Sequence, residues 1–145
     1  MTQQELLRDE PINFEQVRRF LKSAAVKLER AAAVIPIDEQ TGFQMAYEAM
    51  LRASLGFMLS MGKRPRSTAG HHRVIIDFVA GELGSSYVAF MTTFDRMRRK
   101  RNEAIYEPLG TITETEARAA LDVALRYLHT IHEHIQRRNP QQKLL

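Results

Sequence analysis

The stretch TETEARAALDVALRYLHTIHEHIQRR, residues 113–138, contains the pattern that decides the fold class. Its apolar residues recur every three or four positions, which is the spacing of one face of an α-helix. Thr113 and Glu116 have the spacing of a capping box, in which each side chain satisfies a free backbone N–H of the first turn. The stretch therefore predicts a helix from Thr113 to Arg138 whose inward stripe is Ala117, Leu121, Ala124, Leu128, Ile131 and Ile135.

The same spacing recurs upstream, in segments separated by prolines and glycines that interrupt helices. Asn13 with Gln16 predicts another capped helix start. Gly84 should end one helix, and Ser85 or Ser86 should cap the next. The predicted helices cover residues 13–35, 41–61, 71–83 and from Ser85 or Ser86 to 106, with a basic loop over residues 62–67.

No segment shows the alternation of apolar and polar residues that is typical of strands, and no internal repeat is visible. A chain of 145 residues has about the usual size of one domain. The sequence therefore predicts a single all-α domain over residues 1–145. Its expected architecture is an up-and-down bundle of four long helices plus one short helix.

Composition argues against several classes of protein. Hydrophobic residues at 44% and charged residues at 26% are typical of a folded soluble chain rather than a disordered one. No apolar run is long enough to span a membrane, and the acidic start MTQQELLRDE lacks the apolar segment of a secretory signal, so we expect a cytoplasmic protein with no membrane partner. Because there is no cysteine, no phosphate-cradling glycine loop and no nucleophile motif, we expect no cofactor.

Basic residues are concentrated in two places, although the net charge is only +4. Local positive charge of this density attracts phosphate groups, so both places are candidate binding sites for RNA or a nucleotide. The alternative interpretation of each is an ordinary solvated face. In a bundle of this kind the loop should lie near one end of the fourth helix. The two groups are Arg96, Arg98, Arg99, Lys100 and Arg101 in the fourth helix, and Lys63, Arg64 and Arg66 in the loop.

Arg101 occupies a position on the fourth helix that would ordinarily be apolar. Its direction lies about 20° from Phe94 and about 40° from Ile105 at about 100° per residue. Burying an unpaired guanidinium costs roughly several kcal/mol. Three interpretations therefore stay open: an ion pair with a core acid such as Glu48, a functional arginine in a cleft, or a side chain that reaches solvent. The apolar stripe that Arg101 interrupts is Tyr87, Phe90, Phe94, Met97 and Ile105.

The histidines are weaker candidates for chemistry. His129, His132 and His134 include a pair three residues apart, which can share a helix face and bind a metal. Carboxylates at matching offsets are few, so we interpret them as a solvent-facing polar strip and expect no metal site. His71 and His72 open the third predicted helix, where a cap or surface role is favoured over catalysis.

The stretch FDRMRRKRNEAIY, residues 94–106, resembles the signature helix of the HEPN family (higher eukaryotes and prokaryotes nucleotide-binding domain). The approach to it is similar: an Ala-Tyr-Glu-Ala helix at 46–49, the basic loop at 62–67 and a histidine-led helix. The resemblance implies a four- to five-helix bundle that forms a homodimer around an arginine-lined cleft. Many members are metal-independent ribonucleases of toxin–antitoxin and defence systems, and others pair with a minimal nucleotidyltransferase.

In this family the cleft carries an Arg-x4–6-His motif, and the chain departs from it. Arg101 and Asn102 match the motif arginine and its usual polar neighbour, but Tyr106 stands where the histidine would be. Histidine titrates near about 6.5 and accepts a proton at neutral pH, whereas tyrosine titrates near about 10 and stays protonated. A tyrosine can still donate a hydrogen bond to phosphate or stack on a base.

The leading hypothesis is a HEPN-like homodimeric binding module for RNA, a nucleotide or a partner protein, with an antitoxin or a nucleotidyltransferase as the implied partner. The alternative is a metal-independent, toxin-type ribonuclease in which Arg101, Asn102 and Tyr106 act in catalysis. The third is a structural bundle in which Arg101 anchors an ion pair. The predicted binding residues are Lys63, Arg64, Arg66, Arg98, Arg99, Lys100 and Arg101.

Overall fold

A computed structural model describes residues 3–66, 71–107 and 112–144. The described residues are mostly helical, which confirms the all-α class. They form five α-helices and two short strands, with 3₁₀ turns at Gln3–Leu6 and Ser85–Tyr87. The helices are α1 (Phe14–Val34), α2 (Glu39–Ser60), α3 (His71–Leu83), α4 (Val88–Tyr106) and α5 (Glu114–Arg138), and the strands are β1 (Leu7–Asp9) and β2 (Lys63–Pro65).

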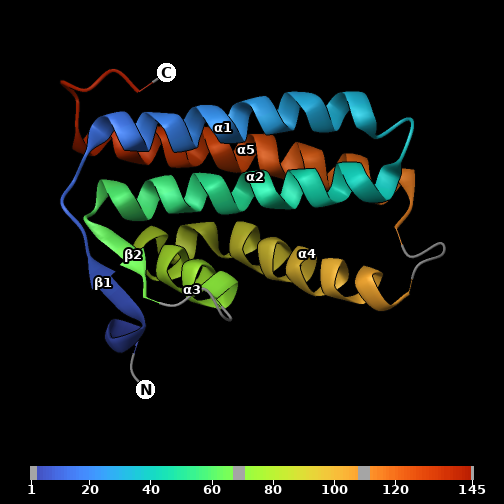
Figure 1. Ribbon diagram of the computed structural model, residues 1–145, viewed down its shortest axis with the longest axis horizontal. Helices are drawn as coiled ribbons and strands as arrows, with labels where there is room; N and C mark the ends of the chain where they lie inside the picture. The colour runs from blue at the N-terminus through green and yellow to red at the C-terminus, as the bar shows by residue number, and fades with distance from the viewer. Residues whose placement is uncertain (1–2, 67–70, 108–111, 145) are drawn as a thin grey trace.

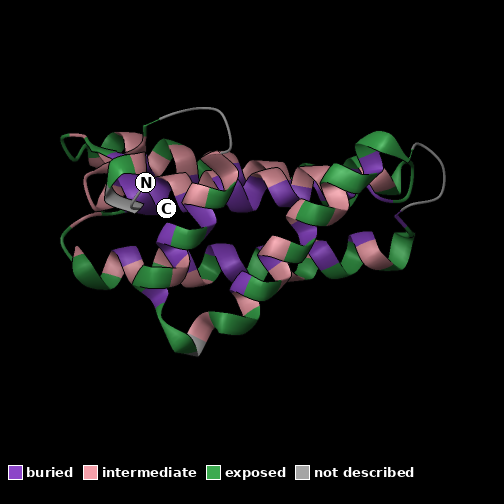
Figure 2. Ribbon diagram, turned by 90° about the horizontal axis from the view of Figure 1, so that it is seen from below, coloured by how far each residue is buried: buried purple, intermediate pink, exposed green. Residues whose placement is uncertain are grey.

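The helices pack around α2. α1 and α5 lie alongside α2, and α3 and α4 pack against it from the other side (Figure 1). The buried faces of the helices turn toward one another, as Figure 2 shows. At the centre of the core, the hydroxyl of Ser54 (α2) donates to the carbonyl of Met50 and lies 2.6 Å from the phenol oxygen of Tyr127 (α5). This pair gives the core its polar link between α2 and α5.

Side chains cap the starts of the three longest helices. Asn13 accepts hydrogen bonds from the backbone N–H groups of Glu15 and Gln16, at 3.0 and 3.2 Å. Thr113 and Glu116 form both halves of the predicted capping box. α2 begins at Glu39, two residues before the predicted start, because the side chain before it, Asp38, accepts the N–H of Thr41 at 3.2 Å. The predicted starts at 13 and 113 are confirmed.

The prediction of no strands was wrong for the basic segment 62–67. Its residues Lys63–Pro65 form β2, which pairs antiparallel with β1 in the register Leu7↔Pro65, Arg8↔Arg64 and Asp9↔Lys63. A strand of three residues is too short to show an alternating pattern, and its pairing partner lies more than fifty residues away in the sequence.

The predicted start of the fourth helix needs correction, whereas its predicted end at Tyr106 is confirmed. Gly84, with φ at 80°, ends α3 as expected, but a 3₁₀ turn then occupies Ser85–Tyr87. Tyr87 is the N-cap of α4 and makes no side-chain capping bond, so the predicted serine cap was wrong. Ile105 was predicted to be buried but is 58% exposed, because α4 slants away from α2 toward its C-terminal end (Figure 1).

Within the described ranges, no helix combines the length and the apolar character that crossing a membrane requires.

Candidate functional site

Three side chains from three helices meet where α2, α3 and α4 come together. The phenol oxygen of Tyr47 (α2) lies 3.1 Å from Nδ1 of His72, in the first turn of α3. The guanidinium carbon of Arg101 (α4) lies 5.8 Å from the centre of the Tyr47 ring, a cation–π distance. Because the three residues are far apart in the sequence, only the fold assembles them.

Arg101 reaches this position because its helix turns an apolar stripe toward α2. Phe94 lies two turns before it on the same face and meets the Tyr47 ring edge-on at 5.6 Å between centroids. Met97 and Ala104 on α4 are also buried. The inward placement predicted for Arg101 is therefore confirmed.

The predicted ion-pair partner of Arg101 was wrong. Glu48 instead binds Lys27 of α1, with Nζ 2.7 Å from the carboxylate oxygen. Among the described residues, no carboxylate lies within 4.0 Å of the Arg101 guanidinium. Arg101 therefore faces the bundle with an aromatic ring beneath it and, in the described part of the chain, without a neutralising acid.

Positive charge exceeds negative charge beside this trio. Asp95 of α4 is shared by Arg98 at 3.0 Å, Arg99 at 3.6 Å and Arg73 of α3 at 3.2 Å. Arg73 also pairs with Asp77 of its own helix at 3.2 Å. A groove of about 480 Å³ runs between α3 and α4 and is lined in part by Arg73, Asp95 and Arg99. The junction thus presents more guanidinium groups than carboxylates, which favours an anionic ligand.

Burial sets the protonation states of the hydrogen-bonded pair. It raises the pKa of Tyr47 to about 12, against the opposing influence of Arg101 and Arg98. Burial also lowers the pKa of His72, and the positive charges of His71, Arg101 and Arg98 act in the same direction. At neutral pH the phenol is protonated and the imidazole is neutral. When Nδ1–H of His72 donates to the phenol oxygen, Nε2 holds a lone pair that can accept a proton.

Searches of family models, curated proteins and solved structures found no match to this chain. The HEPN resemblance of residues 94–106 therefore stays a prediction. What the chain does is inferred below from the chemistry of the site, since a helical bundle alone does not define a function.

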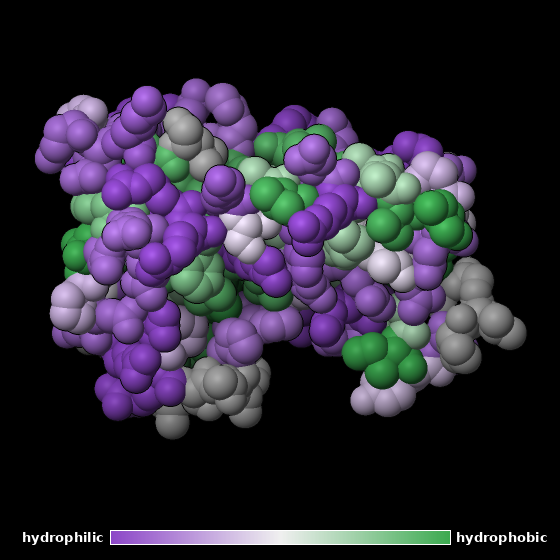
Figure 3. Space-filling view, turned by 45° about the horizontal axis from the view of Figure 1, so that its top comes forward, coloured by the Kyte–Doolittle hydropathy of each residue, from purple (hydrophilic) through white to green (hydrophobic). Residues whose placement is uncertain are grey.

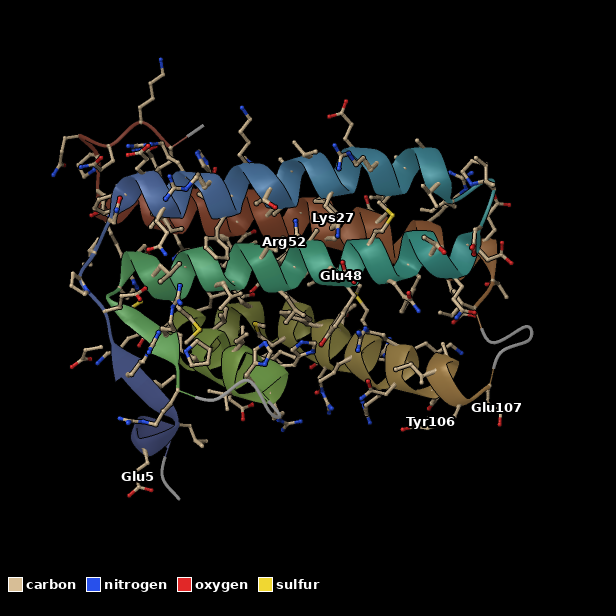
Figure 4. The ribbon with its side chains drawn as sticks, in the orientation of Figure 1. Glu5, Lys27, Glu48, Arg52, Tyr106 and Glu107 are labelled. Carbon is tan, nitrogen blue, oxygen red and sulfur yellow. The ribbon has the colours of Figure 1, made fainter. Side chains whose placement is uncertain are left out.

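The other predicted residues of α4 point in different directions. Lys100 reaches Glu116 of α5 at 3.4 Å, and Asn102 is exposed. Tyr106, the last residue of the helix, is 83% exposed, and Figure 4 shows it pointing away from the other helices. At about 100° per residue, Tyr106 is turned about 140° from Arg101. The three predicted catalytic residues do not converge within one copy of the chain.

The predicted basic loop is largely neutralised by the N-terminal strand. Lys63 pairs with Asp9, and Arg64 lies 3.2 Å from Glu10. Arg66 donates to the carbonyl of Leu7 at 3.4 Å. β2 lies at the end of the bundle where α4 begins, whereas Arg98 to Arg101 lie in the second half of α4 (Figure 1). The two basic groups of the sequence are therefore not joined into one surface.

The histidines of α5 lie in different surroundings. His129 is exposed and pairs with Glu133 at 3.1 Å, as expected for a polar strip. His134 instead packs edge-on against Phe57 and Tyr87, and burial lowers its pKa. Within the part of the chain that is described, no three histidine or acidic side chains gather as metal ligands.

Sequence reasoning missed His72 and Tyr47 as members of the site. His72 was interpreted as a cap or surface residue, and Tyr47 as a core residue of the apolar stripe of α2. The available signal was the histidine-led helix immediately after a basic segment. Its distance from Arg101 in the sequence concealed the contact.

Proposed function

We propose that this chain is a HEPN-like homodimeric binding module that holds a phosphate group of RNA or a nucleotide beside Arg101, Arg98 and His72. The observation that carries the proposal is the inward guanidinium of Arg101, which has no carboxylate within 4.0 Å among the described residues. A phosphate oxyanion supplies the missing counter-charge and matches the planar fork of an arginine. An antitoxin or a nucleotidyltransferase remains the proposed protein partner, through the family resemblance.

Dimerisation is part of the proposal because it would complete the predicted residue set. Ile105 and Tyr106 leave apolar surface exposed at the end of α4. A two-fold contact through this helix buries that surface and brings Asn102 and Tyr106 of one copy toward the cleft of the other. The proposed site would then combine Arg101 and His72 of one copy with Asn102 and Tyr106 of the other.

The test is fluorescence anisotropy with a labelled single-stranded RNA, comparing wild type with Arg101→Met. Charge-assisted hydrogen bonds are worth about 1.5–3 kcal/mol, so the variant should bind at least about tenfold more weakly. Arg126→Met is the matched control, because Arg126 is exposed on α5 and pairs with Asp122. Equal affinities for wild type and Arg101→Met would contradict the proposal.

A metal-independent ribonuclease is the second candidate, favoured by the neutral imidazole of His72 at this site. His72 Nε2 would take the proton of a ribose 2′-hydroxyl, and the 2′-oxygen would attack phosphorus. The bond from phosphorus to the 5′-oxygen would break, water would protonate that oxygen, and a 2′,3′-cyclic phosphate would remain. Arg101 would stabilise the charge on phosphorus oxygens.

This candidate assigns the base to His72 rather than to Tyr106, so the two variants distinguish them. Cleavage of RNA in excess chelator should fall by about 10²-fold or more in His72→Asn and stay near wild type in Tyr106→Phe. Intact RNA after prolonged incubation with wild type would leave the binding module as the function.

A further inference from the structure

A second basic groove lies between α1 and α2, apart from both basic groups that the sequence analysis singled out. It encloses about 370 Å³ and is lined by five cationic side chains and two others, with no acidic residue in its lining. Lys27 and Arg52 lie close together there, between the two helices, as Figure 4 shows. Seen from the side of α1, the surface is largely hydrophilic, with apolar side chains in separate patches (Figure 3). The lining residues are Arg19, Lys22, Ser23, Val26, Lys27, Arg30 and Arg52.

Among the described residues, the cationic side chains of the groove outnumber the carboxylates that pair with them. Arg19 pairs with Glu15 at 3.7 Å, and Lys27 pairs with Glu48. The other three cations, Lys22, Arg30 and Arg52, have no carboxylate within 4.0 Å among the residues that the structure describes. Within the described ranges, the half-buried Arg52 has the hydroxyl of Ser23 as its one side-chain hydrogen-bond partner.

On α5 the chain places acids one turn before exposed arginines. Arg118, Arg126 and Arg137 of α5 each pair with an acid four residues earlier. In the groove the neighbours of like charge stand three residues apart, Arg19 before Lys22 and Lys27 before Arg30. Like charges at this spacing disfavour the isolated helix, so an ordinary solvated face does not account for the arrangement.

The shape of the cationic set fits a chain of phosphates better than a single anion. Arg19 and Arg30 are eleven residues apart, so at 1.5 Å per residue the cations extend over about 16 Å of α1. The lining contains one apolar side chain, Val26, and no aromatic one. A flat anionic membrane would be met by exposed apolar and cationic tips, whereas a concave groove lined by cations fits the backbone of a strand.

We propose that the groove between α1 and α2 binds the sugar–phosphate backbone of single-stranded RNA, without preference for base sequence. The choice of RNA rests on the proposed function. The groove and the Arg101 site are close along α2, because Lys27 of the groove binds Glu48, which directly follows Tyr47 of the Arg101 site.

The experiment measures the binding of a labelled oligouridine of about 15 nucleotides across a salt series, by anisotropy. The groove variant is Lys22→Gln/Arg30→Gln/Arg52→Gln, and the control Arg118→Gln/Arg126→Gln/Arg137→Gln removes the same charge from α5. Each phosphate contact on a single strand contributes about 0.7 to the log–log salt slope, so the groove variant should lose about 2 units of slope. Its affinity at moderate salt should fall at least about tenfold and that of the control less than about threefold.

A milder variant, a second ligand and a comparison with Arg101→Met distinguish the remaining explanations. Lys22→Gln/Arg30→Gln changes only exposed residues, should leave folding intact, and should lose about 1.4 units of slope. If the groove and α5 triple variants lose the same RNA affinity and salt slope, the proposal is wrong, and RNA is attracted by the net positive charge of the protein rather than by the groove. Groove-dependent binding to phosphatidylserine vesicles without binding to oligouridine would also overturn the proposal. If Arg101→Met binds like wild type while the groove variant binds weakly, the groove stands and the Arg101 site fails; the converse result removes the groove alone.

Discussion

Replacing Arg101 by methionine separates a ligand-binding arginine from one that anchors the fold. The substitution keeps an unbranched stem of similar length and removes the charge. The cation–π contact with Tyr47 that is lost is worth about 0.5–2 kcal/mol. Against this, the variant no longer holds a partly buried guanidinium without a carboxylate partner among the described residues. We therefore expect the free energy of unfolding to change by no more than about 1 kcal/mol.

A structural anchor predicts a different magnitude. Removing one partner of a buried ion pair costs about 3–5 kcal/mol, which in a chain of this size lowers Tm by about 6 °C or more. Urea denaturation and thermal melting of wild type and Arg101→Met measure the difference directly. A loss of about 3 kcal/mol together with unchanged RNA affinity would refute the reasoning and favour the structural bundle.

Three further predictions concern other parts of the molecule. The pKa values of His72 and His134 are lowered in the folded chain, so the stability that their neutral forms contribute should be fully present above about pH 6.5 and decrease below it. His72→Gln should make this decrease smaller, as measured by urea midpoints between about pH 7 and 5. Tyr127→Phe should cost about 1 kcal/mol of unfolding free energy in urea denaturation, since Ser54 keeps its bond to the Met50 carbonyl. Ile105→Glu should shift the proposed homodimer toward monomer in light scattering, and a monomeric wild type would contradict the proposed dimer.

The helices could be predicted because the information that defines them is local. The stripe and capping box of residues 113–138 lie within one segment, and α3 begins and ends at the predicted residues, 71 and 83. The short sheet could not be predicted, because pairing of Leu7 with Pro65 is a contact between distant segments of three residues each. Burial of Ile105 was predicted from its angle on the helix, yet burial also requires a neighbouring helix, and α4 leaves its neighbour at that end.

The candidate site was predictable only in its local part. The position of Arg101 on an apolar stripe indicated that its side chain turns inward, which the structure confirms. Its surroundings come from α2 and α3, so Tyr47 and His72 carried no signal in the stretch around residue 101. For the same reason Glu48, named as a partner from its residue type, binds Lys27 instead.

The contacts of the candidate site and of the groove both involve α2, although the family resemblance lies in α4. More than half of the 22 residues of α2 are buried, which is typical of a helix packed on several sides. Polar groups in such a helix are costly unless each has a partner, and Ser54 and Glu48 have theirs in Tyr127 and Lys27. Across the groove Arg52 donates to the hydroxyl of Ser23, and the guanidinium of Arg101 lies over the ring of Tyr47. Among the described residues, Arg52 of α2 and Arg101, which lies over Tyr47 of α2, have no carboxylate within 4.0 Å, and one bound anionic strand would supply a counter-charge to both.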